Sequence, residues 1–214
     1  MPGSRSLRRG LYAADRTAVL IVDAYNDFLS ASGKLWPQIR AVAESVDLLA
    51  HLGAVLAAAR WAGASIVYVP HRRWVEGDYD GWRYPNPWQL AGDRDALFAD
   101  GTWGGDWHPD LAPQPGDILI QQHWGQSGFA NTDLNFELKQ RGIEKIILIG
   151  LAANTCVEAT ARHGAELGYH ITLVRDATAA ASPEAMQAAH EINGPTFAHS
   201  IVTTETLIAR LRSP

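Results

Sequence analysis

Short apolar runs alternate with helical segments along most of the chain, and this alternation constrains the fold more than any other feature. The runs are rich in Val and Ile, as is typical of strands, and they cover residues 17–23, 65–69, 117–121, 145–149, 171–174 and 201–203. Helical segments are predicted at residues 38–62, 132–140, 154–167 and 183–192. Because successive parallel strands need crossover connections, this order predicts a Rossmann-like, three-layer α/β/α fold with a mostly parallel, six-stranded central sheet.

One irregular segment, residues 70–115, interrupts the alternation and is dense in Trp, Gly, Asp and Pro. We expect one domain over residues 1–214 that carries this segment as a long insertion, since 214 residues fit a single core and no linker or repeat is visible. Its tryptophans either line a pocket or form a small aromatic core or an oligomer interface. We favour the second interpretation for most of them, which are Trp74, Trp82, Trp88, Trp103 and Trp107.

Composition excludes several classes of partner. A net charge of −5 and a pI near 5.9 leave no basic surface for nucleic-acid phosphates or an anionic membrane. The longest apolar run, residues 146–153, is too short to span a bilayer, and the arginines Arg5, Arg8 and Arg9 are not followed by the apolar stretch of a secretory signal. A single cysteine suits a reducing compartment, so we expect a cytoplasmic protein.

That cysteine, Cys156, follows a predicted strand by one short loop. Asn154 or Thr155 can cap a helix that begins there, which places the thiol in the first helical turn. Free N–H groups and the helix dipole at that position favour a thiolate, lower its pKa and can stabilise an oxyanion. Away from such a setting, a lone cysteine is more often a small buried hydrophobe.

Two further polar side chains follow predicted strands. Asp23 ends the first apolar run, and His123 comes shortly after the third. Active sites of parallel α/β sheets lie beyond the carboxyl ends of the strands, where both residues would meet Cys156. Taken singly, Asp23 is as well explained as a turn cap, and an isolated histidine after a strand is more often structural. Their joint placement favours a catalytic site.

Three motifs add a family resemblance that covers nearly the whole chain: VLIVDAYNDF at the first strand, SGFANTDL after the third, and GLAANTCVEATAR around the cysteine. Together they resemble the isochorismatase-like cysteine hydrolases, a superfamily that includes nicotinamidases and carbamoylsarcosine, ureidoacrylate and biuret amidohydrolases. The resemblance implies an isochorismatase-like fold, Asp23 as catalytic acid, Cys156 as nucleophile and a cis peptide bond before Ala152.

The chain departs from this family at one catalytic position. The family's lysine stands six residues before the phenylalanine of the second motif, and here that residue is His123. The triad is therefore interpreted as Asp23, His123 and Cys156. A lysine carries a fixed charge, whereas a histidine with an ordinary pKa near 6.5 can be neutral or charged, so the lysine's role does not transfer unchanged.

The resemblance implies a cofactor-free hydrolase that cleaves the C–N bond of a small amide, ureido or carbamoyl compound through a thioester. The backbone N–H groups of Ala152 and Cys156 would form the oxyanion hole. Two alternatives remain open: an isochorismatase-type hydrolase of a vinyl ether, which needs no thiol, and a non-catalytic binding or scaffold protein on the same fold.

Nicotinamidases of the family carry an Asp-x-His metal motif after the second strand, where this chain has Val69, Pro70 and His71. We therefore expect no bound metal. Phe28 of the first motif, His71 and Trp124 are the expected substrate contacts, although His71 is equally well explained as a loop residue bonded to backbone. The family commonly assembles, and we expect a homo-oligomer.

Overall fold

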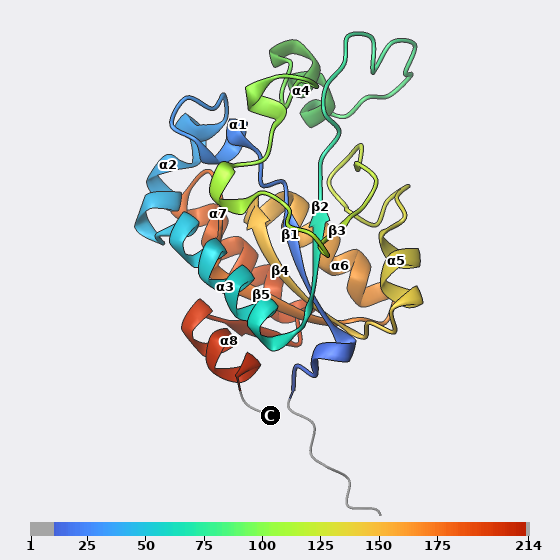
Figure 1. The fold of residues 1–214 in the computed structure, drawn as a ribbon. Helices are drawn as coiled ribbons and strands as arrows, with labels where there is room; N and C mark the ends of the chain where they lie inside the picture. Colours follow the sequence, from blue (N-terminus) through green and yellow to red (C-terminus); the bar gives the residue numbers. More distant parts are fainter. Residues whose placement is uncertain (1–10, 213–214) are drawn as a thin grey trace, which may run out of the picture.

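The computed structural model describes residues 11–212, so the arginine-bearing start of the chain lies outside the described residues. Its strands form one parallel sheet in the order β3-β2-β1-β4-β5-β6 (Figure 1), which confirms the predicted six-stranded α/β architecture. The strands are β1 Thr17–Val22, β2 Ser65–Val69, β3 Ile118–Leu119, β4 Lys145–Leu151, β5 His170–Ala179 and β6 Ser200–Val202.

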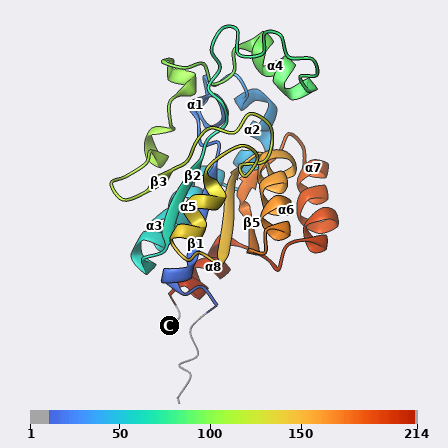
Figure 2. The same ribbon diagram turned by 90° about the vertical axis from the view of Figure 1, so that its right-hand side faces the viewer.

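Helices cover both faces of the sheet, as Figures 1 and 2 show. One face carries α2 Trp36–Ser45, α3 Leu48–Ala62 and α8 Thr204–Leu211, and the other carries α5 Leu134–Gln140 and α6 Glu158–Glu166. Every residue of β1 is buried, with Val19 and Ile21 packed on the first side and Leu20 and Val22 on the second. Burial on both faces explains why the strand is a continuous apolar run instead of an alternating one.

The predicted helix over residues 38–62 is wrong as a single element. It consists of α2 and α3, which are separated by Val46 and Asp47 and bent by 70°. Asp47 adopts a left-handed conformation with φ of 48°, which a continuous helix does not allow. Within the described range no single helix has the length and hydropathy to cross a membrane, and α2 and α3 pass that criterion only together across their bend.

Strand lengths also differ from the prediction. β3 is confined to Ile118–Leu119, whereas β5 continues to Ala179 past an irregularity in its pairing with β4. Gly150 lies at that irregularity with φ of 107°, and a Cβ atom there would stand 2.2 Å from the carbonyl oxygen of Val22. Glycine therefore permits β1 and β4 to approach closely at their carboxyl ends, where the candidate site begins.

The irregular segment after β2 contains more regular structure than its composition indicates. α4, Pro87–Asp95, begins with a capping box in which Asn86 and Gln89 satisfy each other's backbone N–H groups. Short 3₁₀ turns follow at Trp103–Gly105 and Pro109–Leu111. Two short α-helices, α1 Asn26–Leu29 and α7 Pro183–Gln187, lie near the carboxyl end of the sheet (Figure 1).

Candidate active site

Three of the predicted site residues meet at the carboxyl ends of the strands. Asp23 directly follows β1, and His123 follows β3. Cys156 follows β4, which is the neighbour of β1 in the sheet. One ligand-type atom from each side chain lies within 4.8 Å of those of the other two. All three residues are at most 2% exposed, so the group is closed off from bulk water.

The backbone of Asp23 holds its carboxylate toward the other two side chains. Its φ of 53° is unusual for a residue with a side chain, and its N–H donates to the carbonyl of Val69 at 3.1 Å. Oδ1 lies 3.1 Å from Nε2 of His123, and Oδ2 is buried without a hydrogen-bond partner among the described residues. Asp23 is therefore not the turn cap that was its alternative role. Asp27 holds the loop, because its carboxylate accepts the backbone N–H groups of Lys34 and Phe98.

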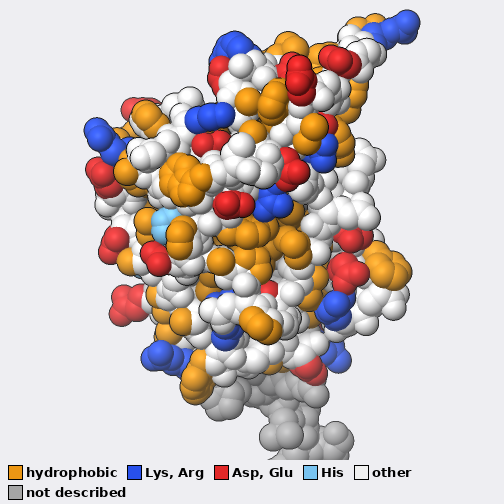
Figure 3. Space-filling model, turned by 45° about the horizontal axis from the view of Figure 1, so that its top comes forward, with side chains coloured by type: hydrophobic (Ala, Val, Ile, Leu, Met, Phe, Trp, Pro, Cys, Tyr) orange, Lys and Arg blue, Asp and Glu red, His pale blue; other side chains and the backbone are white. Residues whose placement is uncertain are grey.

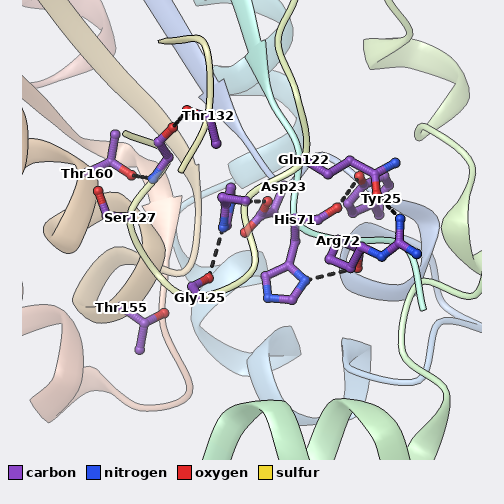
Figure 4. A network of polar contacts seen from close by, with 12 residues as sticks. Asp23, Tyr25, His71, Arg72, Gln122, Gly125, Ser127, Thr132, Thr155 and Thr160 are labelled. Carbon is purple, nitrogen blue, oxygen red and sulfur yellow. Dashed lines mark hydrogen bonds and ion pairs between the residues drawn. The ribbon is translucent and has the colours of Figure 1, made fainter. Parts of the chain in front are cut away.

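His123 lies between two acceptors, the Asp23 carboxylate and the Gly125 carbonyl, both of which are labelled in Figure 4. Nδ1 is 2.8 Å from the carbonyl oxygen of Gly125, which can only accept, so this nitrogen carries a proton. Nε2 faces a carboxylate, so a proton is favoured there as well. Burial lowers the pKa of His123, but the charge and hydrogen bond of Asp23 and the Gly125 carbonyl outweigh burial and raise it. The surroundings favour the imidazolium.

His71 is the neighbour of His123 but has the opposite surroundings. The two residues form a parallel bridge that extends the pairing of β2 with β3. Nδ1 of His71 donates to the carbonyl of Arg72 at 3.0 Å, and Nε2 accepts the indole N–H of Trp88 at 3.2 Å. Burial, with the charge of His123, lowers the pKa of His71 to about 4. Both ring nitrogens of this neutral imidazole are therefore occupied by protein partners.

Cys156 lies on the turn that connects β4 to α6. The peptide bond between Leu151 and Ala152 is cis, as predicted from the resemblance. A π-helical turn over Ala153–Val157 runs into α6, so the thiol is in the first helical turn as expected. The predicted cap is wrong: the N-cap is Ala152, which has no side-chain acceptor, because the helical turn begins before Asn154.

The expected lowering of the thiol pKa is also wrong. Burial, followed by the negative charge of Asp23, raises the pKa of Cys156 well above its usual range and outweighs the hydrogen bonds from the turn. A helix start stabilises a thiolate only where the desolvation penalty is smaller than the dipole's contribution. The resting site is therefore a thiol beside a carboxylate.

The turn also places the two predicted oxyanion donors. Ala152 is the N-cap of the π-helical turn and Cys156 is its fourth residue, and the N–H groups of Thr155 and Val157 both donate to the carbonyl of Ala152. The chain therefore curls around Ala152 beside the nucleophile.

The predicted substrate contacts lie in different surroundings. Phe28, on α1, is buried against Phe98 with ring centroids 5.2 Å apart. Trp124, next to His123, is half-buried, packs on Trp82 at 5.5 Å and carries the guanidinium of Arg72 at 4.7 Å. Hydrophobic side chains interspersed with charged ones cover this end of the molecule (Figure 3).

Three contacts around the site have no signal in the sequence. They are the Gly125 carbonyl against His123, the Trp88 indole against His71, and the side-chain amide of Gln89, which donates to the carbonyl of Trp124 at 2.7 Å. Every residue has a backbone carbonyl, so the residue type does not show which carbonyl makes such a contact. Gln89 and Trp88 lie on α4, whose position over the strand ends follows from tertiary packing.

Comparison with known proteins identifies the family. Residues 17–205 match the model of the isochorismatase domain. The chain is 34% identical over 202 residues to the ureidoacrylate amidohydrolase RutB of Caulobacter vibrioides, covering 88% of each chain, and 35% identical over 197 residues to RutB of Stutzerimonas stutzeri, covering 86% of this chain and 78% of that protein.

Solved structures give the same result. A cysteine hydrolase from Pseudomonas syringae pv. phaseolicola superposes with a TM-score of 0.79 at 28% identity, covering 92% of this chain and 93% of its own. N-carbamoylsarcosine amidase from Thermoplasma acidophilum superposes with a TM-score of 0.65 at 25% identity, covering 89% and 97%. With the family model and both RutB relatives spanning most of its length, this chain belongs to the isochorismatase family of hydrolases.

Proposed function

We propose that this protein hydrolyses the C–N bond of a small ureido, carbamoyl or amide compound, with Cys156 as nucleophile. The observation that carries the proposal is the convergence of a buried carboxylate, imidazole and thiol at the carboxyl ends of β1, β3 and β4. The RutB and carbamoylsarcosine amidase relatives support the substrate class.

The chemistry begins with the thiol, whose pKa is raised by burial, so that a neighbouring base must take its proton. The Asp23 carboxylate is that base. The thiolate then attacks the substrate carbonyl, and the N–H groups of Ala152 and Cys156 stabilise the tetrahedral oxyanion. Collapse breaks the C–N bond, and the leaving amine takes the proton from Asp23.

The second half of the cycle reverses these roles. Water attacks the thioester while Asp23 accepts its proton, and the proton returns to the sulfur as the acid product leaves. His123 supplies the positive charge that lysine supplies in relatives, because its two acceptors hold it as an imidazolium beside Asp23. No step requires a cofactor.

The neighbouring residues shape the pocket. We assign Phe28 and Trp124 to substrate contact, and His71 to a wall of the pocket, since both of its ring nitrogens are already bonded. We also propose that residues 1–214 act as one domain, that the protein is cytoplasmic, and that it assembles with itself through the exposed aromatic side chains of the irregular segment, which include Trp82 and Trp103.

Replacement of the nucleophile tests the proposal. Cys156→Ala should abolish ammonia release from a panel of small amides, ureas and carbamoyl compounds, while its unfolding midpoint stays close to that of the wild type. A covalent acyl adduct on Cys156, seen by intact mass after rapid acid quenching, should accompany turnover by the wild type. Turnover by Cys156→Ala at the wild-type rate would refute the assignment and leave the vinyl-ether or binding alternatives.

A further inference from the structure

The catalytic group is also a set of metal ligands. Asp23, His123 and Cys156 offer a carboxylate oxygen, an imidazole nitrogen and a sulfur, all within 4.8 Å of one another. In a tetrahedral zinc site with usual bond lengths, pairs of ligand atoms stand roughly 3.4–3.6 Å apart. The three atoms therefore need to converge by only about 1 Å to hold one ion.

The surroundings of His123 are those of a metal-bound histidine. Its Nδ1 donates to the Gly125 carbonyl at 2.8 Å, which leaves Nε2 as the nitrogen directed toward Asp23. Ligating histidines characteristically donate their other ring N–H to a carbonyl or carboxylate, which fixes both the tautomer and the ring orientation. His123 thus already has the orientation that a metal ion would require.

A second observation points to a ligand at this place. Oδ2 of Asp23 is buried in a residue that is 0% exposed, and it meets no donor with ordinary hydrogen-bond geometry among the described residues; the Cys156 thiol, a weak donor, interacts with the same carboxylate. A buried carboxylate oxygen that has at most a weak donor is costly unless a cation or a stronger donor fills the position. A divalent ion between Asp23, His123 and Cys156 would pair with this oxygen.

Charge balance favours the same occupant. A divalent ion, a carboxylate, a thiolate and a neutral imidazole sum to zero, and a neutral assembly is what a buried site tolerates best. Binding releases the Cys156 thiol proton and the Nε2 proton of His123 to solvent. Thiolate and imidazole select zinc and its close analogues over Mg²⁺ and Ca²⁺, which prefer oxygen ligands.

We propose that this site reversibly binds one Zn²⁺ ion through Asp23, His123 and Cys156, and that the bound ion inhibits the enzyme by occupying the nucleophilic sulfur. The inhibition, though not the binding, rests on the proposed function. Sensitivity to zinc follows from His123: a lysine ammonium at this position provides no lone pair and repels the cation. The departure from the family's lysine therefore creates a metal site, which differs from the Asp-x-His motif whose absence led us to expect no bound metal.

Cobalt provides a direct test because tetrahedral Co²⁺ is coloured and reports thiolate ligation. The chelator-treated full chain is titrated with Co²⁺ and then with Zn²⁺. One equivalent of Co²⁺ should give tetrahedral d–d bands and a thiolate-to-cobalt charge-transfer band, and one equivalent of Zn²⁺ should abolish both. His123→Lys and Cys156→Ser should each weaken binding at least about tenfold, in line with the usual cost of disturbing a metal site.

A second histidine pair provides the control. His170 and His199 stack with ring centroids 4.6 Å apart at the amino-terminal end of β5 and just before β6, away from the catalytic group. His199→Gln should bind Co²⁺ like the wild type. Equal binding by the wild type, His123→Lys and Cys156→Ser, or loss of binding in His199→Gln alone, would overturn the proposal.

Activity measurements with and without zinc distinguish a failure of this proposal from a failure of the proposed function. Hydrolysis by the wild type should fall in proportion to zinc occupancy and return on chelation, whereas His123→Lys should keep its own zinc-free rate at the same zinc concentration. Full activity of the zinc-loaded wild type would refute inhibition. A wild type that binds one Co²⁺ through Cys156 but cleaves no C–N substrate would refute the proposed function and leave the metal site standing.

Discussion

The loops that follow β2 and β3 each place one buried histidine at the same edge of the sheet, and the pKa values of the two rings are shifted in opposite directions. His71 and His123 lie with ring centroids 5.0 Å apart and are both at most 4% exposed. Yet the pKa of His71 is lowered to about 4, while that of His123 is raised. Burial acts in the same direction on both, so burial does not decide the charge.

The partners of the two rings decide it. Nε2 of His71 faces the indole N–H of Trp88, a donor that requires a neutral ring nitrogen. Nε2 of His123 faces the carboxylate of Asp23, an acceptor that favours a proton. One contact at one ring atom thus separates a structural histidine from a cationic one, and each of the following experiments alters one of these contacts.

Asp23→Asn should have the largest effect, because it removes both the base and the charge that distinguishes His123 from His71. We expect kcat/KM to fall by about 10²–10⁴-fold, as for loss of a general base, and the pKa of His123, followed by ¹⁵N NMR of the imidazole, to fall as well. Asp27→Asn is the matched control. It should lower stability, since Asp27 accepts two backbone N–H groups, while leaving the pKa of His123 in place.

Substitution of His123 should have the next largest effect. His123→Ala should lose about 10²-fold in kcat/KM, as expected when one electrostatic stabiliser of the reaction is removed, and His123→Lys should retain substantial activity because it restores a cation. Since the raised pKa keeps the imidazolium above pH 6.5, wild-type kcat/KM should fall as pH rises through that pKa. In His123→Lys, kcat/KM should show no such fall near neutral pH. Alanine activity equal to wild type would reduce the site to an Asp23–Cys156 dyad.

The two histidines should also make opposite contributions to the pH dependence of folding stability. His71 has a folded pKa of about 4, below its unfolded value of 6.5, so the unfolded chain binds more protons and stability falls as pH drops from 6.5 toward 4. His123 stabilises the fold below its unfolded pKa, and this contribution is lost as pH rises through its raised pKa. Between pH 7 and pH 5, the unfolding free energy of the wild type, measured by urea unfolding, should fall by about 2 kcal/mol more than that of His71→Gln. An equal fall in the two proteins would show that His71 is protonated in the fold.

Trp88→Phe should have the smallest effect. It removes the donor to Nε2 of His71 but keeps an aromatic ring, so we expect a loss of about 1 kcal/mol in unfolding free energy and a change in kcat/KM below about tenfold. Trp61→Phe, at a ring on α3 that is 70% exposed, serves as the control and should change neither quantity. A large loss of activity in Trp88→Phe alone would move His71 from the pocket wall into the catalytic group.

The central sheet was predictable because its strands are buried on both faces and therefore stand out as apolar runs. Where burial was not the deciding factor, the prediction failed. The break between α2 and α3 depends on the left-handed conformation of Asp47, which leaves the apolar pattern unchanged. The eight-residue helix α8 was missed for another reason: its Thr203 cap and its buried Leu207 and Leu211 were local signals that the prediction did not use.

The location of the site was predictable, but the charges and pKa values of its residues were not. The carboxyl ends of the strands located Asp23, His123 and Cys156, and parallel topology explains why they meet. The thiol pKa was predicted in the wrong direction, because the helix start is visible in the sequence and complete burial is not. The charge of His123 likewise depends on Gly125, which contributes only a carbonyl oxygen.

Gln89 links two parts of the molecule that the chain sequence separates. Its side chain accepts the N–H of Asn86 at the start of α4 and donates to the carbonyl of Trp124, one residue from His123. Displacing α4 from the sheet would release the Trp124 carbonyl, whereas the Asn86–Gln89 cap lies within α4 and would move with the helix. The Gln89 amide therefore ties the position of α4 to the backbone next to His123, so a change at a helix far along the chain can reach the cation beside Asp23.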